Sequence, residues 1–313
     1  MFIKVVCGQK DERLLNKERS RNTIWKKHIV NKSNQFLKNM IKSSVTINLV
    51  KQIKTGPWIY WEPLNVSIPK AAMLGFNGVE LYIPSADEID VNVLDRLLLK
   101  FDLQLSAIGT GAGKVLYGLS LTNPDEEIRK QAVLFIKKII AFGARFGAPS
   151  IIGSMQGNVI HNIEREQSID WLATGLDILG EFAEKLGVTL IFEPLNRYET
   201  NLINQLDEGV KLINLHHIRN LKLLADLFHM NIEETSLSES IRNFGKYIGY
   251  VHFADSNRYS VGKGHIQLQE IANALLDIKY KGYISAEAFP FPDSDNAAKT
   301  TIETFNKYFK NEI

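Results

Sequence analysis

The sequence predicts an α/β protein in which eight parallel strands, each followed by a helix, close into a (β/α)8 TIM barrel with a basic N-terminal extension. From Ser44 onward, short β-branched or apolar runs alternate with segments of helical period, which is the pattern of βα units. Eight such units in about 250 to 275 residues fit a barrel better than a doubly wound sheet. The chain contains neither a GxGxxG nor a Walker A motif, so a nucleotide-binding sheet is not indicated.

Eight apolar runs have the length and composition of buried parallel strands. They cover residues 45–50, 78–83, 103–109, 150–155, 188–194, 221–227, 250–255 and 282–289. The segments between them have apolar residues three and four positions apart, which predicts helices that pack one face on a sheet. These helices cover residues 62–75, 87–101, 124–147, 165–186, 203–215, 236–246, 267–278 and 294–310.

The predicted helix 124–147 has clear start signals. Asn123 is a suitable N-cap, Pro124 suits the first helical position, and Glu126 has the spacing of a capping box. Its apolar side chains fall on one face, which we expect to pack against the sheet. They are Ile128, Ala132, Phe135, Ile136 and Ile139.

Composition narrows the class of protein. The 313 residues are 45% hydrophobic and 23% charged, which is enough apolar material for a large core and excludes a disordered chain. The single cysteine, Cys7, cannot form an intramolecular disulfide or a CxxC metal site, so we expect a reducing, cytoplasmic location. No apolar stretch reaches the roughly 18 residues that span a bilayer, so a membrane role is not expected.

The net charge of +2 conceals two regions of opposite sign. Residues 1–39 carry ten Lys or Arg against three acids, a balance of +7, and the remainder of the chain carries −5. Residues 1–39 lack the apolar core and cleavage site of a secretory signal, and Met40 stands just before the first strand. We therefore expect a poorly ordered leader, translated from upstream of the true start, followed by one barrel domain over residues 40–313.

Residues of metal-ligand type follow four consecutive predicted strands. Glu193 comes near the end of the fifth strand, Asp226 of the sixth, His252 of the seventh and Glu287 of the eighth. Barrel active sites lie at the C-terminal ends of the strands, so these four side chains should meet. Each alone could be a salt-bridged acid, a helix cap or a core histidine, but four on successive strands are hard to explain as coincidence.

Three buried carboxylates and one imidazole would be unstable together without a cation between them. The set therefore predicts one divalent metal ion. Three oxygen ligands, one nitrogen and no sulfur favour Mn²⁺, Mg²⁺ or Co²⁺, with Zn²⁺ also possible, and we expect Mn²⁺ first. Two tryptophans that follow the first strand, Trp58 and Trp61, could line the mouth of such a site or pack on a neighbouring loop.

Four segments contain the candidate ligands and their neighbours: residues 192–199 (FEPLNRYE), 226–230 (DLFHM), 251–258 (VHFADSNR) and 285–287 (SAE). They resemble the xylose-isomerase-like sugar phosphate isomerases and epimerases, particularly the ketose 3-epimerases of the tagatose and psicose type. The four candidate ligands are separated by 33, 26 and 35 residues, which also fits that family. The resemblance extends from Met40 to the C-terminus and is strongest over residues 188–290.

The resemblance implies metal-dependent epimerisation of a ketose, or of a ketose phosphate, at carbon 3. It implies that Glu193 and Glu287 act as acid and base on opposite faces of the carbon, while both also bind the metal with Asp226 and His252. The reaction would pass through an enediolate that the metal stabilises. The resemblance further implies a homodimer or homotetramer.

The resemblance also implies three residues that contact the sugar, namely Glu199, His229 and Arg258. Each has a simpler structural interpretation. Glu199 could cap the following helix, His229 could be a loop residue, and Arg258 could pair with Asp255.

The same four metal-ligand residues would also suit other reactions. Aldose–ketose isomerisation, hydroxypyruvate isomerisation and dehydration of a cyclic polyol all use a metal-stabilised enediolate. An abasic-site endonuclease would need more histidines than strands 78–83 and 103–109 offer, and the body charge of −5 opposes nucleic-acid binding. A non-catalytic sugar-binding barrel would be expected to lose one of the two glutamates.

Overall fold

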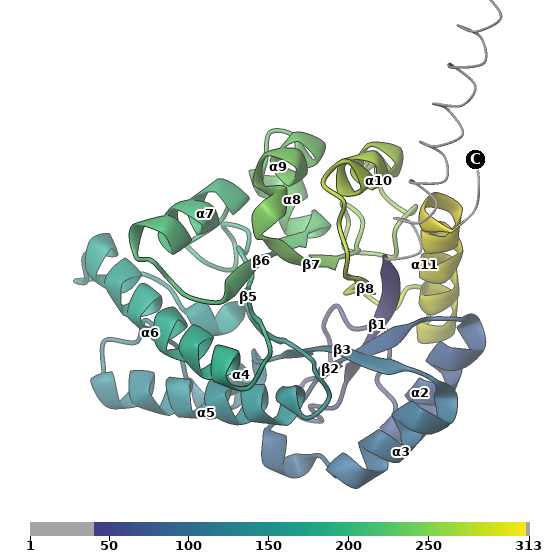
Figure 1. Ribbon diagram of the computed structural model, residues 1–313, viewed down its shortest axis with the longest axis horizontal. Helices are drawn as coiled ribbons and strands as arrows, with labels where there is room; N and C mark the ends of the chain where they lie inside the picture. The colour runs from purple at the N-terminus through teal and green to yellow at the C-terminus, as the bar shows by residue number, and fades with distance from the viewer. Residues whose placement is uncertain (1–40, 311–313) are drawn as a thin grey trace, which may run out of the picture.

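The computed structural model describes residues 41–310, in which eight parallel strands form a closed barrel in sequence order (Figure 1). Each strand pairs with its sequence neighbours, and β1 pairs with β8 to close the barrel. The strands are β1 (Lys42–Asn48), β2 (Gly78–Tyr82), β3 (Gln104–Gly109), β4 (Ser150–Ile152), β5 (Leu190–Phe192), β6 (Leu221–Asp226), β7 (Ile248–His252) and β8 (Tyr283–Ala286). The predicted barrel is confirmed.

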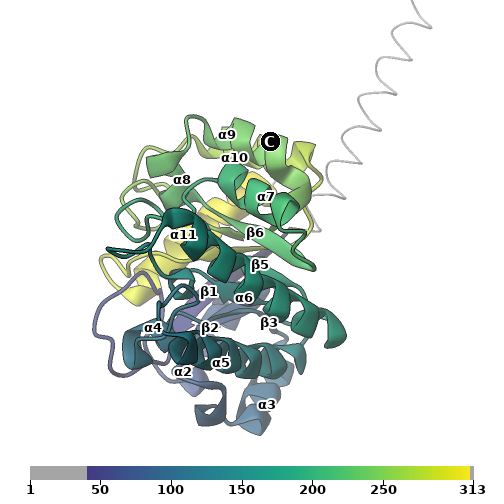
Figure 2. The same cartoon turned by 90° about the vertical axis from the view of Figure 1, so that its left-hand side faces the viewer.

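Helices surround the barrel, as Figures 1 and 2 show from two directions. The helices are α2 (Leu64–Leu74), α3 (Val91–Phe101), α4 (Ala112–Tyr117), α5 (Glu126–Ala144), α6 (Arg165–Lys185), α7 (Leu206–Leu215), α8 (Leu227–Glu233), α9 (Leu237–Phe244), α10 (Leu268–Asp277) and α11 (Ser294–Phe309). Short 3₁₀ turns span Ala86–Glu88, Ser154–Gln156 and Gly245–Tyr247. Within residues 41–310, no helix is both long and apolar enough to cross a lipid bilayer. The predicted leader, 1–39, lies outside the described residues, and its separation from the barrel stays a prediction.

Most strand residues are buried on both sides of the sheet, and most of them are apolar. One face packs on the surrounding helices and forms the main core, which includes Ile136 and Ile139 of α5. The other face fills the barrel interior with a small cluster of side chains from the consecutive strands β3 to β7. That cluster contains Ala107, Ile151, Ile191, Leu224 and Tyr250.

The predicted start of α5 was wrong by two residues. Asp125 is the N-cap, and its side chain accepts a hydrogen bond from the backbone amide of Glu127 at 2.8 Å. Asn123 instead stabilises the preceding turn, because its side-chain oxygen accepts a hydrogen bond from the amide of Asp125. Two good capping residues stand two positions apart here, and Pro124 lies between them and not inside the helix.

Two short helices were not predicted from the sequence, and both follow directly from strands. α4 comes three residues after β3, and α8 begins at the residue after Asp226, the last residue of β6. Asp226 caps α8, because its Oδ1 accepts hydrogen bonds from the amides of Phe228 and His229. The chain therefore turns sharply at the C-terminal end of β6, and this turn brings His229 back over the barrel.

Candidate metal centre and active site

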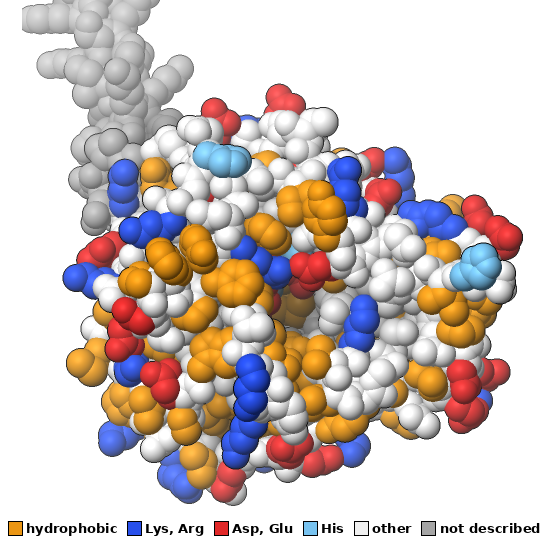
Figure 3. Space-filling view, turned by 180° about the vertical axis from the view of Figure 1, so that it is seen from behind, with side chains coloured by type: hydrophobic (Ala, Val, Ile, Leu, Met, Phe, Trp, Pro, Cys, Tyr) orange, Lys and Arg blue, Asp and Glu red, His pale blue; other side chains and the backbone are white. Residues whose placement is uncertain are grey.

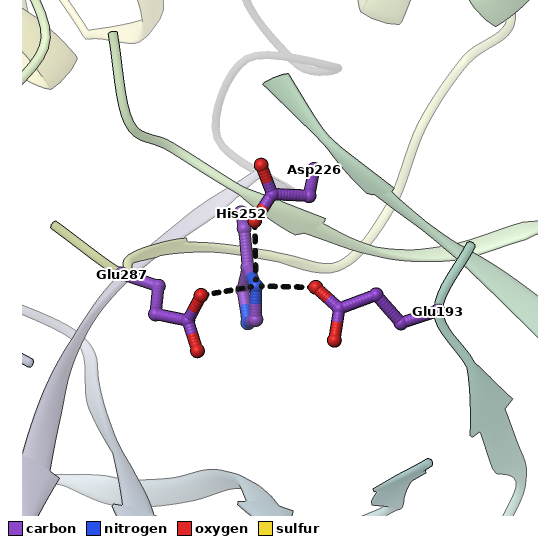
Figure 4. Close-up of side chains that lie close together, drawn as sticks. All are labelled: Glu193, Asp226, His252 and Glu287. Atoms are coloured by element: carbon purple, nitrogen blue, oxygen red, sulfur yellow. Dashed lines mark hydrogen bonds and ion pairs between the residues drawn. The ribbon is translucent and has the colours of Figure 1, made fainter. Parts of the chain in front are cut away.

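The four predicted ligand residues meet at the C-terminal end of the barrel. Asp226 and His252 are the last residues of β6 and β7, and Glu193 and Glu287 each come directly after β5 and β8. One coordinating atom of each residue lies within 4.8 Å of those of the other three. Figure 4 shows the three carboxylates arranged around the imidazole of His252.

His252 Nδ1 lies at the centre of this cluster. It is 3.3 Å from Glu193 Oε1, 3.3 Å from Asp226 Oδ2 and 3.5 Å from Glu287 Oε2 (Figure 4). One ring nitrogen can donate at most one proton, so it cannot satisfy three carboxylate oxygens. A cation placed among these four atoms would satisfy all of them.

Two buried polar atoms support this interpretation. Among the described residues, neither Glu193 Oε1 nor His229 Nε2 has a hydrogen-bond partner. A buried polar group without a partner is costly, so both atoms are poised for a ligand. Three carboxylate oxygens and one imidazole nitrogen fit a divalent ion of the Mn²⁺, Mg²⁺, Co²⁺ or Zn²⁺ group.

Burial and mutual charge perturb the acids of the cluster. Burial raises the pKa of Glu287 to about 8, and the charges of Glu193 and Asp226 add to the effect while His252 and Arg258 oppose it. Burial also favours protonation of Asp226, but His229 and His252 outweigh it and hold its pKa well below the usual range. For His252, burial lowers the pKa, yet the surrounding carboxylates, Glu80 and Glu287 foremost, raise it well above its ordinary value.

The loop after β4 shapes the position of Glu193. A Cβ atom on Gly153 would collide with Glu193 Oε2, so any larger residue would force the carboxylate to move. Gln156 donates a hydrogen bond from Nε2 to the backbone oxygen of Glu193 at 3.1 Å. Neither Gly153 nor Gln156 has a side chain of metal-ligand type, so the role of neither could be predicted from the sequence.

Arg258 reaches into the same site. Its guanidinium donates to Glu199 Oε1 at 2.8 Å and to Glu287 Oε2 at 3.1 Å, and it lies over the ring of Phe228. The suggested pairing of its side chain with Asp255 is not formed. The Asp255 carboxylate instead accepts hydrogen bonds from backbone amides of its own loop.

His229 lies on α8 and not in a loop, and it faces the candidate ligands. Its Nδ1 lies 3.2 Å from the backbone amide of Asn196 and 2.7 Å from the side-chain amide nitrogen of the same residue. Both neighbours are donors, so Nδ1 is an acceptor and the neutral ring carries its proton on Nε2. Nε2 lies 3.9 Å from Glu193 Oε1, and it offers an N–H group to whatever occupies the site.

The site opens into a cavity of about 210 Å³. The lining includes all three residues predicted to contact a sugar, together with Glu193, His252 and Glu287. Trp58 also lines the cavity and stacks on Tyr82 at 4.4 Å, whereas Trp61 packs against Trp58 from outside it. Figure 3 shows the hollow at the centre of one end of the molecule, with apolar side chains around much of its rim.

A second hollow, of about 810 Å³, lies beside the C-terminal ends of β1 and β2. The loop after β1 and the connection between β2 and α3 line it, and its lining residues all fall within 48–93. The candidate ligands are therefore not part of it. The smaller cavity is therefore the candidate active site, although the second hollow has the larger volume.

The sequence of this chain matches the model of a known protein family. The family model described as "Xylose isomerase-like TIM barrel" matches residues 68–308. The chain belongs to this family. Membership agrees with the closed barrel and with the resemblance noted in the sequence.

Similar members of the xylose isomerase-like family include sugar epimerases. The chain is 31% identical over 244 residues to D-psicose 3-epimerase of Ruminiclostridium cellulolyticum, covering 74% of this chain and 82% of that one. It is 28% identical over 240 residues to L-ribulose 3-epimerase of Methylomonas sp., covering 75% and 82%. The prediction of a carbohydrate isomerase is confirmed by these relatives, because an epimerase is an isomerase.

A solved structure shows the same fold. D-psicose 3-epimerase of Clostridium cellulolyticum H10, determined with D-tagatose, superposes with a TM-score of 0.73. The alignment covers 86% of this chain and all of that chain, at 24% identity. This likeness concerns the fold alone.

One further acidic residue of this chain contacts one of the four candidate ligands and was not predicted from the sequence. Glu80, the third residue of β2, is buried, and its Oε1 lies 3.2 Å from His252 Nε2. In the sequence, the strand 78–83 stood out only for holding no histidine. The available signal was a lone carboxylate inside an apolar strand, which requires a buried partner.

Proposed function

We propose that this protein is a divalent-metal-dependent epimerase that inverts carbon 3 of a ketose or a ketose phosphate. The observation that carries the proposal is the pair Glu193 and Glu287, whose carboxylates approach His252 Nδ1 from different strands at the base of one cavity. The named activities of the similar family members support it.

Two opposed carboxylates suit the inversion of a carbon centre. One glutamate removes the proton from carbon 3, and the electrons of the C–H bond move onto the adjacent carbonyl oxygen to give an enediolate. The other glutamate then donates a proton to the opposite face, which inverts the centre without net oxidation. When bound, a divalent ion among Glu193, Asp226, His252 and Glu287 would stabilise the negative charge that develops on the substrate oxygens.

Each carboxylate has two oxygens, so one oxygen can hold the ion while the other moves a proton. We assign Glu287 and Glu193 as this acid–base pair, and which of them acts first depends on the epimer that is bound.

Three more residues would orient the sugar. The guanidinium of Arg258 and the Nε2–H of His229 are donors that face the cavity, and Glu199 is an acceptor at its edge. Donors of this kind suit a carbonyl or hydroxyl oxygen, and an acceptor suits a hydroxyl proton. Trp58 provides an apolar wall against which carbon atoms of the sugar can pack.

The direct test is hydrogen exchange at carbon 3. The purified protein is loaded with Mn²⁺ and incubated in deuterated water with a panel of ketoses and ketose phosphates, and NMR locates the deuterium. We expect deuterium at carbon 3 together with the 3-epimer. Exchange at carbon 1 would indicate aldose–ketose isomerisation, and loss of water would indicate a dehydratase.

An abasic-site endonuclease remains the alternative of another class. Such chemistry needs a cluster of metals, whereas residues 41–310 hold one group of four potential ligands. Cleavage of abasic DNA is the assay that would support it. Mn²⁺ as the physiological ion, a cytoplasmic location and a homodimer or homotetramer stay predictions.

A further inference from the structure

Glu80 occupies an unusual place for a carboxylate, below the candidate metal centre and inside the barrel. Only 5% of its surface is exposed. Neighbouring interior positions of the barrel include the apolar Ala107, Ile151 and Leu224. A carboxylate in such surroundings is retained only where donors satisfy it, so the contacts of Glu80 indicate what it does.

The first contact is with the outer nitrogen of a candidate ligand. Glu80 Oε1 lies 3.2 Å from His252 Nε2, and His252 Nδ1 is the nitrogen that faces the other three ligands. A carboxylate can only accept, so this contact requires a proton on Nε2. In the neutral imidazole, Nδ1 is then unprotonated and its lone pair points toward Glu193, Asp226 and Glu287.

The second contact holds the carboxylate itself. Tyr250 donates its hydroxyl proton to Glu80 Oε2 at 3.1 Å. Ser106 Oγ lies 2.8 Å from the Tyr250 hydroxyl, and Ser44 Oγ lies 2.6 Å from Ser106 Oγ. The Ser106 hydroxyl also lies within donating distance of the Val79 backbone oxygen, at 3.0 Å, so of these three hydroxyls only that of Tyr250 contacts Glu80 directly. Tyr250 on β7 therefore holds the carboxylate on β2 in place.

We propose that Glu80 is a positioning residue that accepts a hydrogen bond from His252 Nε2–H and so presents the Nδ1 lone pair to the metal ion. The proposal rests on the metal centre of the proposed function. Carboxylates that accept from the outer nitrogen of a ligand histidine fix the tautomer and the ring orientation and increase ligand basicity. Glu80 would act on the ion through His252, and it also lines the cavity.

Metal affinity tests this role without reference to activity. Isothermal titration of the full-length, metal-stripped protein with Mn²⁺ compares the wild type with Glu80→Gln and Glu80→Leu. The glutamine carbonyl can still accept the Nε2–H bond without the charge, so we expect affinity to fall about tenfold. Leucine has a similar size but no acceptor, and we expect a loss of about a hundredfold.

The matched control is Ser44→Ala. Ser44 belongs to the same buried chain of hydroxyl groups but lies at its far end from His252, so we expect wild-type affinity. Circular dichroism and the melting temperature establish that each variant is folded. In the Co²⁺-loaded protein, the visible absorption bands should change in Glu80→Leu and remain those of the wild type in Ser44→Ala, because only the first alters the ligand geometry.

Wild-type affinity in a folded Glu80→Gln or Glu80→Leu variant would overturn the proposal. Equal losses in Ser44→Ala and Glu80→Leu would also overturn it, since they would indicate general damage to the core. A wild-type protein that binds no Mn²⁺ would refute the metal centre, and this role of Glu80 with it. The failure of the metal centre is thus distinguishable from a failure of Glu80 alone.

Discussion

Gly153 controls the position of Glu193, which makes Gly153→Ala a sharp test of the proposed site. The new methyl group would overlap Glu193 Oε2, whereas ordinary contact distances are about 3.5 Å, so the carboxylate must move by about 1 Å. A misplacement of about 1 Å can cost about a hundredfold in rate, or about 2.7 kcal/mol of barrier. We therefore expect kcat/KM for the ketose identified by deuterium exchange to fall about a hundredfold.

Gly175→Ala is the matched control for this substitution. Gly175 is buried in α6, and a Cβ there would meet Leu121 Cδ2 at 3.1 Å, which a small movement of that side chain relieves. We expect wild-type kinetics from this variant, and unchanged circular dichroism from both. A kcat/KM for Gly153→Ala within twofold of the wild type would refute the assignment of Glu193 to the reaction.

Three further predictions concern separate parts of the molecule. Glu287→Gln should reduce the rate of carbon-3 exchange at least about a thousandfold. Its melting temperature should be retained, because a buried carboxylate is replaced by a neutral group. Near-normal exchange would remove Glu287 from the acid–base pair. Ile139→Ala should lower the free energy of unfolding by about 3 kcal/mol, since Ile139 is fully buried in α5; a urea titration that shows less than about 1 kcal/mol would contradict that packing. Arg219→Met should reduce stability at pH 7, because hydrogen bonds from Arg219 lower the pKa of Asp177. A lowered carboxyl pKa stabilises the folded state above the pKa of the unfolded chain, near 4, and this stabilisation is lost as the pH falls through the pKa of the folded state. Urea titrations should therefore show the difference in unfolding free energy between variant and wild type narrowing below about pH 4. A difference that does not change with pH would argue against the Arg219–Asp177 pair.

The barrel could be predicted because its signals are local and repeated. Each strand is an apolar run and each long helix has one apolar face, so eight repeats of that pattern left few alternative folds. The positions of the candidate ligands followed from this count, because each ends or directly follows a strand. Because barrel active sites lie at the C-terminal ends of the strands, the four candidate ligands were expected to lie close together.

The missed features depend on short segments or on distant pairing. α4 has six residues and α8 has seven, which is too few to display an apolar period. The contact of Glu80 with His252 joins residues that are 172 positions apart, and it requires knowing that β2 and β7 face each other across the barrel. The role of Gly153 likewise depends on a side chain from the next strand.

In the proposed reaction, two glutamates invert carbon 3 of a ketose beside a divalent ion. The most direct measurement is the location of deuterium in the sugars recovered from deuterated water, with Mn²⁺-loaded protein and with the same protein after chelation. We predict deuterium at carbon 3 in both epimers with Mn²⁺ and none after chelation. Absence of carbon-3 exchange with every ketose and ketose phosphate, or equal exchange after verified metal removal, would contradict the account.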